Sequence, residues 1–357
     1  MAIRLNTALA TGLLAAAALT LGCSERHAPL AGILADATAS PSNQATSYSG
    51  RATVVNASVP GLAPIVLVDA ALSPSGGAEE ASLLNASVPG LLTAEVLHAS
   101  TIGKGNSSES EASVANVVLT VGGNTISGDF LESRATAKCT GSGATVSGSS
   151  EITALSVNNQ TIMISGQPNQ TVSLPIGQVI INEQHTGPGE ITVNALHVIV
   201  PEIADVIVSS AHADITCQPA PSPPSPPPGC PGTDFVTGGG WITVPPSGSR
   251  ANFGVGGGTK QGWGHLTYID HGPNGPRVKG TGVTAYGVIE GTTTRHIEGT
   301  AQINGQDGFT YKVDVADNGE PGRDDTFAIE LWKGMSKVYS ASGTLGGGNI
   351  QLHTPCQ

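Results

Sequence analysis

A proline-rich segment at residues 218–231, with the sequence QPAPSPPSPPPGCP, divides the chain into two parts. Proline fixes φ and has no N–H to donate, so this segment fits neither a helix nor a central strand. We expect polyproline II, which advances about 3.1 Å per residue and holds the ends of the segment about 30 Å or more apart. Because the Cα atoms of a disulfide lie about 4.4–6.8 Å apart, Cys217 and Cys230 are not expected to pair. Each of them therefore needs a partner in its own domain.

The composition favours strands and turns. The chain has 357 residues, which is enough for two domains with separate cores. Only 12% of the residues are charged and 4% are aromatic, whereas Gly (48) and Pro (24) are abundant. This predicts an all-β fold, with two β-sandwich or barrel-like domains joined by a polyproline linker after an N-terminal signal peptide. The net charge of −12, without a Lys/Arg cluster, argues against binding to nucleic acid.

The N-terminus has the pattern of an export signal. Arg4 precedes an apolar stretch, residues 5–21, that is short for a membrane-spanning helix. The sequence TLGC at residues 20–23 resembles a bacterial lipobox, although that motif prefers Leu in the first position and a small residue in the second. A lipobox is cleaved before its cysteine, so Cys23 would carry diacylglycerol. The alternative is an ordinary secretory signal that is cut downstream, for example after Ala28.

The five cysteines agree with this organisation. Lipidation of Cys23 leaves four cysteines, two in each domain. The predicted segments are a signal peptide (1–22), a flexible tether (23–43), a first β domain (44–217), a proline-rich linker (218–229) and a second β domain (230–357).

Two alternating segments of the first domain predict its disulfide. Residues 130–139 and 207–217 each alternate apolar and polar side chains, and each ends in a cysteine on the apolar face. Their positions predict a buried Cys139–Cys217 bridge. In the second domain Cys230 stands at the start and Cys356 at the end, so a bridge between them would tie both termini together and stabilise the domain by about 4 kcal/mol in the chain-entropy model.

Short sequence patterns predict individual strands and turns. The sequence NASVPGL occurs at residues 56–62 and again at 85–91, which predicts two similar strand-plus-turn units. In the second domain, residues 309–315 and 327–331 alternate as strands do, and GPNGP at 272–276 predicts a turn between two strands.

Longer stretches resemble a known family. In the first domain these are AEEASLLNASVPGLLTAEVLHAS (78–100), SGQPNQTVSLP (165–175), INEQH (181–185) and ITVNALHVIV (191–200). They resemble the choice-of-anchor P family of bacterial surface domains, over about the whole first domain. The resemblance implies a surface-exposed β domain without a defined molecular activity.

The second domain resembles the β domain that commonly follows choice-of-anchor P domains. The stretches that carry this resemblance are VTGGGWI (236–242), ANFG (251–254), GHLTYIDH (264–271) and DNGEPG (317–322). That domain too is a β module of surface proteins without established chemistry. The chain departs from the family in one respect, because no sorting signal or hydrophobic tail follows the second domain. The expected anchor is therefore the lipid on Cys23.

An acidic loop is the best candidate for a cofactor, which would be Ca²⁺. Oxygen ligands clustered on a loop suit Ca²⁺. The spacing is not that of an EF-hand, and Arg323 lies among the acids, so the alternative is a solvated turn. The candidate ligands are Asp314, Asp317, Asn318, Glu320, Asp324 and Asp325.

Aromatic residues of the second domain suggest a site for a glycan ligand. Trp241, Trp263 and Tyr268, with Trp332, could form a platform on which a sugar ring stacks. The alternative is that these rings belong to the core, as most Trp residues of small β modules do.

Histidines give a weaker indication of metal. His265 and His271 are six residues apart on one strand face, about 20 Å, so they cannot share an ion. His197 and His212 are expected on neighbouring strands, but no Cys or carboxylate stands at ligand spacing, which disfavours a metal site there.

The sequence contains no established catalytic signature, such as a nucleophile elbow, a zincin helix or a P-loop. Only Glu183, His185 and Glu190 leave a convergent catalytic group open. The chain is therefore expected not to be an enzyme, but a cell-envelope surface lipoprotein with a structural or adhesive display role. Its lipid would attach it to the membrane, and its ligand would be an extracellular glycan or protein. The alternatives are a calcium-stabilised module that binds glycans or polymers, a secreted hydrolase, and a secreted rather than anchored location.

Overall fold

The computed structural model describes residues 47–140, 143–217, 234–260 and 262–354. These residues form strands, turns and loops, and none of them lies in a helix. The predicted all-β fold is confirmed. The signal peptide, the tether, the proline-rich linker and Cys23, Cys230 and Cys356 lie outside the described residues.

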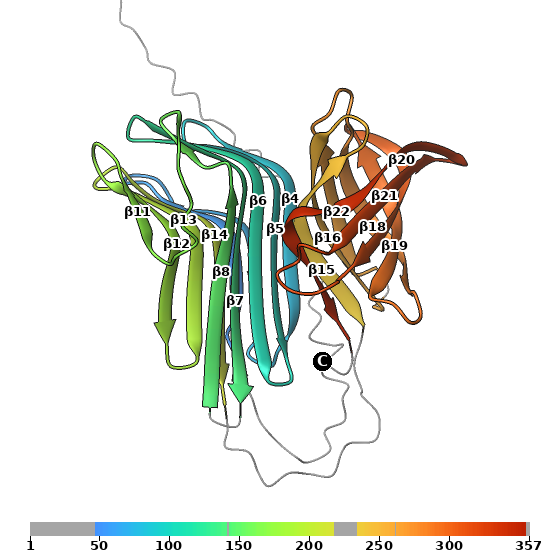
Figure 1. Cartoon of the computed structure of the whole chain (residues 1–357), viewed down its shortest axis with the longest axis horizontal. Helices are drawn as coiled ribbons and strands as arrows, with labels where there is room; N and C mark the ends of the chain where they lie inside the picture. Colours follow the sequence, from blue (N-terminus) through green and yellow to red (C-terminus); the bar gives the residue numbers. More distant parts are fainter. Residues whose placement is uncertain (1–46, 141–142, 218–233, 261, 355–357) are drawn as a thin grey trace, which may run out of the picture.

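The first domain is a sandwich of two antiparallel sheets (Figure 1). We call the sheet farther from the second domain the far sheet. Its order is β11 (Gln170–Ser173), β12 (Gln178–Gly187), β13 (Glu190–Val200), β14 (Ala204–Thr216), β2 (Arg51–Ser58) and β3 (Ile65–Ala71), with β1 (Ser47–Tyr48) on β14. We call the sheet against which the second domain packs the docking sheet. Its order is β10 (Gln160–Thr161), β9 (Ser156–Val157), β7 (Asn124–Thr140), β6 (Ser107–Val121), β5 (Leu92–Lys104) and β4 (Gly77–Val88), with β8 (Gly143–Thr153) on β7.

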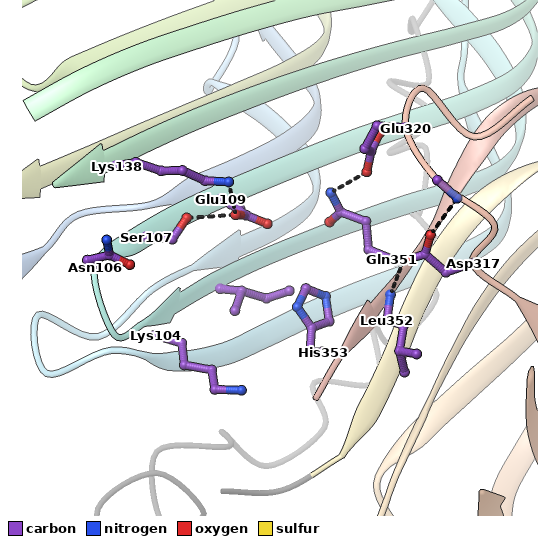
Figure 2. Close-up of a pocket in the computed structure, with 12 residues that line it drawn as sticks. Lys104, Asn106, Ser107, Glu109, Lys138, Asp317, Glu320, Gln351, Leu352 and His353 are labelled. Carbon is purple, nitrogen blue, oxygen red and sulfur yellow. Dashed lines mark hydrogen bonds and ion pairs between the residues drawn. The ribbon is translucent and has the colours of Figure 1, made fainter. Parts of the chain in front are cut away.

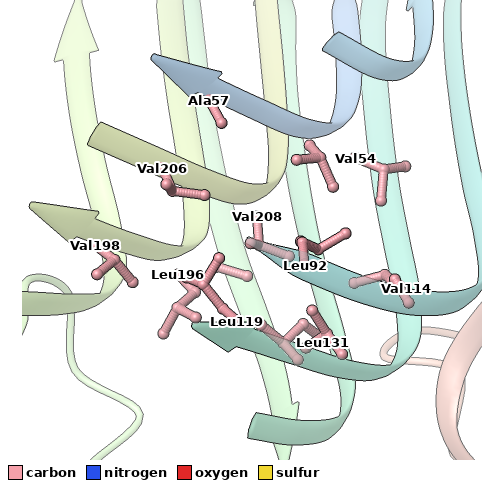
Figure 3. Packing of buried hydrophobic residues seen from close by; sticks show 14 of the residues in the cluster. Val54, Ala57, Leu92, Val114, Leu119, Leu131, Leu196, Val198, Val206 and Val208 are labelled. Atoms are coloured by element: carbon pink, nitrogen blue, oxygen red, sulfur yellow. The ribbon is translucent and has the colours of Figure 1, made fainter. Parts of the chain in front are cut away.

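The core of the sandwich consists of aliphatic side chains from the two facing sheets (Figure 3). Leu97, Val114 and Leu131 of the docking sheet are fully buried against Val198 and Val208 of the far sheet. Along each strand successive residues point to opposite faces of the sheet, so one set of side chains points into this core. Each such side chain contributes about 1.5–3 kcal/mol through burial.

One end of the sandwich is closed by a disulfide between Cys139 and Cys217, the pairing that the alternation predicts. Their Cα atoms are 5.5 Å apart, and the bridge joins residues 78 apart in the sequence. Closing a loop of this length stabilises the fold by about 4.5 kcal/mol in the chain-entropy model.

The repeated NASVPGL sequence forms the same turn twice. A third turn of the same kind occurs elsewhere in the domain, without the glycine. These turns span residues 59–62, 88–91 and 200–203, and in each the fourth N–H donates to the first carbonyl at 3.0 Å. Proline at the second position and a positive φ at the third define a type II turn. The third residue is Gly61 (φ 83°) or Gly90 (φ 74°) in the repeats, but Glu202 (φ 64°) in the third turn.

The second domain is a closed antiparallel barrel, in which the last strand pairs with the first. Its strands are β15 (Phe235–Val244), β16 (Ser249–Gly258), β17 (Gly264–Asp270), β18 (Arg277–Val288), β19 (Thr294–Ile303), β20 (Gln306–Ala316), β21 (Thr326–Lys333) and β22 (Ser336–His353). Closure leaves no unpaired edge strand. The predicted turn at 272–276 joins β17 to β18.

Aromatic residues fill the barrel. Phe253 and Phe327 stack with ring centres 4.0 Å apart, and Tyr311 and Tyr268 are buried beside aliphatic residues. The Tyr268 hydroxyl lies 2.6 Å from that of Tyr339, so its polar group is hydrogen-bonded inside the core. Residues 309–315 and 327–331 alternate as predicted, and their more buried side chains point into the barrel.

The barrel packs against the outer face of the docking sheet (Figure 1). Strand β16 contacts β5, and β17 contacts β4 and β5. All seven residues of β17 are buried, as are residues 235–240 of β15. A strand loses its alternation of buried and exposed positions when both of its faces are covered. One face of each strand meets the barrel core and the other meets the sandwich.

Glycines on β15 and β16 allow this close approach. A Cβ on Gly256 would lie 2.4 Å from Oε2 of Glu80, and one on Gly239 would lie 2.5 Å from Oγ of Ser113. A Cβ on Gly254 would lie 3.2 Å from Cβ of His98. We call Gly239, Gly254 and Gly256 the docking glycines, because a Cβ on each would meet a side chain of the sandwich.

The turn geometry predicts opposite responses to substitution. Gly61→Ala and Gly90→Ala should each destabilise the chain by about 1 kcal/mol, because a Cβ meets nothing within 4 Å and only the positive φ penalises it. Glu202→Gly should leave stability unchanged or raise it, since Glu202 already bears that penalty. Urea denaturation measures all three. Equal destabilisation by Glu202→Gly would contradict the assignment of these turns.

The docking glycines predict a variant that separates the domains. Gly256→Val should displace the barrel from the sandwich, increase the radius of gyration in small-angle X-ray scattering, and split thermal unfolding into two transitions. Gly282→Val is the matched control, because this strand glycine has only the Thr300 hydroxyl within 4 Å, at 3.6 Å. An unchanged radius of gyration for Gly256→Val would show that these contacts do not hold the domains together.

Candidate functional site

The interface between the domains contains most of the unusual chemistry of the chain. The side-chain pairs that cross it include Glu80–His265 (2.8 Å), Glu95–Arg277 (2.8 Å), Asp129–Arg250 (3.1 Å) and Glu320–Arg134 (3.3 Å). Glu80–His265 is buried, whereas the other three pairs are partly exposed and contribute little energy. They do fix the orientation of one domain on the other, because each partner comes from a different domain.

Two histidines stack at the centre of the interface. His98 of β5 is fully buried, and its ring lies 5.0 Å from that of His265 on β17. Nδ1 of His265 lies 2.8 Å from Oε1 of Glu80. Neither ring nitrogen of His98 has a hydrogen-bond partner among the described residues. Burial, with the neighbouring His265, lowers the pKa of His98 to about 3, so its imidazole stays neutral.

A second buried group surrounds Arg134. Its Nε donates to Glu132 at 2.9 Å and lies 3.8 Å from Glu111, and its Nη1 reaches Glu320 of the barrel. Burial outweighs the attraction of Arg134 and raises the pKa of Glu132 to about 7. Burial and the charge of Glu132 also raise the pKa of Glu111 well above its usual value. One guanidinium cannot fully neutralise both buried carboxylates, so Glu132 and Glu111 hold their protons to a higher pH than exposed glutamates do.

Buried acids and histidines with shifted pKa values often act in catalysis. Here they are covered: Glu111, Glu132 and His98 are 4%, 1% and 0% exposed, and Glu80 beside them is 4% exposed. Their partners are other side chains of the two domains. Their geometry therefore suits docking rather than contact with a dissolved substrate.

A cavity of about 490 Å³ lies beside this network, between the end of the β5–β6 hairpin and the barrel (Figure 2). Lys104, Glu109 and Lys138 line it from the sandwich, and Asp317 and His353 from the barrel. Nζ of Lys138 lies 3.6 Å from Glu109. Burial lowers the pKa of His353 to about 4. Both signs of charge line the cavity.

The acidic loop uses its side-chain oxygens to organise the backbone. Asp325 is fully buried and accepts hydrogen bonds from the N–H of Asn318 and of Ile350. Asp317 accepts from the N–H of Gly319 and of Leu352.

Other members of the loop bind side chains or backbone elsewhere. Glu320 contacts Arg134, Asp314 binds His296, and the Asn318 amide donates to the carbonyl of Asp324. Within the described ranges, no three carboxylates of this loop lie within 4.8 Å of one another. The geometry favours the alternative of a hydrogen-bonded turn, and calcium binding there stays a prediction.

The aromatic platform is wrong as a sugar site. Trp263 and Tyr268 are 3% and 0% exposed, so a ligand cannot stack on them. Trp263 packs edge-on against Phe235, and Tyr268 lies in the barrel core. Trp241 is half-buried, with the guanidinium of Arg250 at 4.1 Å over its ring. The reason is packing, because large rings in a small closed barrel are needed to fill it and to seal the interface.

The histidines have separate partners. His265 binds Glu80, whereas Nε2 of His271 lies 3.0 Å from the Asn252 amide oxygen, so the two rings have different partners. His197 and His212 do lie on neighbouring strands, β13 and β14. They are nevertheless apart, because the register places His197 opposite Ile207 and His212 opposite Thr192.

The absence of a carboxylate near His212, expected from the sequence, is wrong. Glu190 and Asp214 lie beside it, because strand pairing across the β13–β14 hairpin brings Glu190 opposite Asp214. The sequence spacing places Asp214 two residues from His212 on one strand face, but only the strand pairing reveals that Glu190 joins them.

Glu183 is the centre of a polar network on the far sheet. Its carboxylate accepts from the Asn194 amide at 2.7 Å, lies 2.8 Å from His197, and lies 3.3 Å from His185. Burial alone would raise the pKa of Glu183, but the hydrogen bonds from Asn194 and His197 outweigh it and lower the pKa. Glu190 is not part of this network, and instead lies near His212.

Sequence reasoning missed Glu80, His98, Glu111 and Glu132. The available indication was indirect: a polar face on residues 130–139 and alternating glycines at residues 254, 256 and 258. Neither pattern shows which surface covers which.

No protein-family model, curated protein or solved structure matches the chain. Among the described residues there is no helix long and apolar enough to cross a membrane.

The opposite pKa shifts of His98 and Glu132 predict how docking depends on pH. The contribution of His98 is complete above its usual pKa of about 6.5 and is lost as the pH falls toward 3. The contribution of Glu132 is complete below about pH 4.5 and is lost as the pH rises through about 7. Relative to wild type, Glu132→Gln should therefore gain stability from about pH 5 to 8, and His98→Gln should gain it from about pH 7 to 4.

Urea denaturation at each pH gives these differences in the free energy of unfolding. Glu202→Gln is the control, because Glu202 is an exposed turn residue. A difference between wild type and Glu132→Gln that stays constant over the whole range would contradict the raised pKa.

Proposed function

We propose that the chain is a non-catalytic surface protein of the bacterial cell envelope, with a structural or adhesive display role. The observation that carries this proposal is the interface of the two domains. The docking glycines and the buried contacts of Glu80 and Arg134 join the sandwich and the barrel into one block. The buried interface side chains with shifted pKa values, His98 and Glu132, pack against side chains of the two domains, which supports a structural role for the interface.

The route to the cell surface is part of the proposal. A disulfide such as Cys139–Cys217 persists in oxidising compartments outside the cytoplasm. The lipobox-like sequence at residues 20–23 supports an anchor at Cys23 in the outer membrane or at the cell surface. The acidic net charge of −12 supports partners other than nucleic acid. An extracellular glycan or protein is the expected ligand class.

The anchor is tested by comparing wild type with Cys23→Ala in a bacterial host. We expect wild type in the membrane fraction, with diacylglycerol on the N-terminal peptide in mass spectrometry, and labelled on whole cells by a membrane-impermeant biotin reagent. Cys23→Ala should lose the lipid and leave the membrane fraction. Identical fractionation of the two proteins would contradict a lipid anchor at this residue.

The non-catalytic role is tested separately. The purified chain should bind a component of a glycan and matrix array without converting it. A panel of ester, peptide and glycoside substrates should show no turnover. Turnover that disappears in Glu183→Ala would instead support a hydrolase, because Glu183 is the best-connected carboxylate on the exposed side of the sandwich.

A further inference from the structure

His197, His296 and His212 each lie near one glutamate and one aspartate, and the group at His212 differs from the other two. In the first, His197 lies between Glu183 (2.8 Å) and Asp205 (3.0 Å). In the second, His296 lies between Asp314 (2.6 Å) and Glu298 (3.1 Å). In both, each ring nitrogen has its own carboxylate.

In the third group the histidine is held differently. Nδ1 of His212 lies 2.9 Å from the hydroxyl of Thr192 on the neighbouring strand. The ligand atoms of His212, Glu190 and Asp214 lie within 4.8 Å of one another. No hydrogen bond or ion pair joins either carboxylate to a side chain in the described part of the chain. Because Nδ1 contacts Thr192, Nε2 of His212 is the ring nitrogen available to bind a further ligand.

The strand register makes this group electrostatically unfavourable by itself. Glu190 of β13 stands directly opposite Asp214 of β14, so two negative charges form a cross-strand pair. Like charges in this position destabilise a sheet. The nearest strand partner with a positive charge is Arg51, opposite His212 on β2, but Asp69 binds it through two hydrogen bonds of 2.8 and 3.0 Å. The group has two acids and lacks a cation.

We propose that Glu190, His212 and Asp214 form a surface site for a divalent transition-metal cation of the Zn²⁺ class. Two carboxylate oxygens and one imidazole nitrogen are ligands that Zn²⁺ binds at about 2.0–2.2 Å. Small side-chain rotations close the present spacing to such bonds, and water completes the coordination at this half-exposed position. One nitrogen ligand and only two acids suit Zn²⁺ better than Ca²⁺, which takes six to eight oxygens.

Thr192 is a positioning residue for this site. With Nδ1 protonated, His212 donates to the Thr192 hydroxyl and leaves Nε2 to bind the cation, as in other sites where a second hydrogen bond fixes the ring of a metal ligand. The cation would neutralise the Glu190–Asp214 pair. The site lies on the outer face of the far sheet, next to the strand end that leads to the Cys139–Cys217 disulfide.

The test is titration of the full, untagged chain with Zn²⁺ by isothermal calorimetry after removal of metals with EDTA. We expect one equivalent of Zn²⁺ to bind, and the melting temperature to rise by a few degrees at saturation. Asp214→Asn and His212→Gln should each weaken binding at least tenfold. His197→Gln is the matched control and should bind as wild type, because both nitrogens of His197 already have partners.

Two further measurements distinguish a site from a general effect. In EDTA, Asp214→Asn should melt at or above the temperature of wild type, because it removes the repulsion from Glu190. Ca²⁺ should bind at least tenfold more weakly than Zn²⁺. Wild-type binding by the Asp214→Asn variant, a lower melting temperature of that variant in EDTA, or equal affinity for Ca²⁺ would each overturn the proposal.

Discussion

The close approach of the barrel to the docking sheet is the constraint on which most of the structure depends. Three docking glycines remove the side chains that would keep the surfaces apart, and Glu80, Ser113 and His98 occupy the space. Polar groups in such a place lose their water, and burial penalises their charged forms. The lowered pKa of His98 and the raised pKa of Glu132 are two results of the same desolvation.

This interface also explains why the two domains depend on one another. The polar face of β7 would be a solvated surface on an isolated sandwich, yet Glu132 is 1% exposed. Arg134 binds Glu132 of its own strand and Glu320 of the barrel, so the same guanidinium compensates buried charge and holds the partner domain. Breaking such a group by removing one member costs more than the group contributes as a whole, because the remaining charge stays buried. The main contribution of the group around Arg134 is therefore to fix the orientation of the barrel on the sandwich.

Much of the fold could be predicted because it rests on local rules. Alternation at residues 130–139 and 327–331 identified buried faces, and the NASVPGL repeat identified two turns with a glycine at positive φ. The Cys139–Cys217 pairing followed from two cysteines on apolar strand faces. The sugar platform failed for a physical reason: an aromatic residue on a strand can face the core, an interface or solvent, and Trp263 and Tyr268 face the first two.

The sequence by itself determined that the chain is all-β, where several of its turns lie and which cysteines of the sandwich meet, because period, turn chemistry and facing are local properties. Only the tertiary structure decided which polar residues are buried and which acids become neighbours. Glu132 is buried because a separate domain covers it, and Glu190 meets Asp214 because the register of β13 and β14 aligns them. Both depend on contacts between strands, and a pattern along one strand contains no information on what lies across from it.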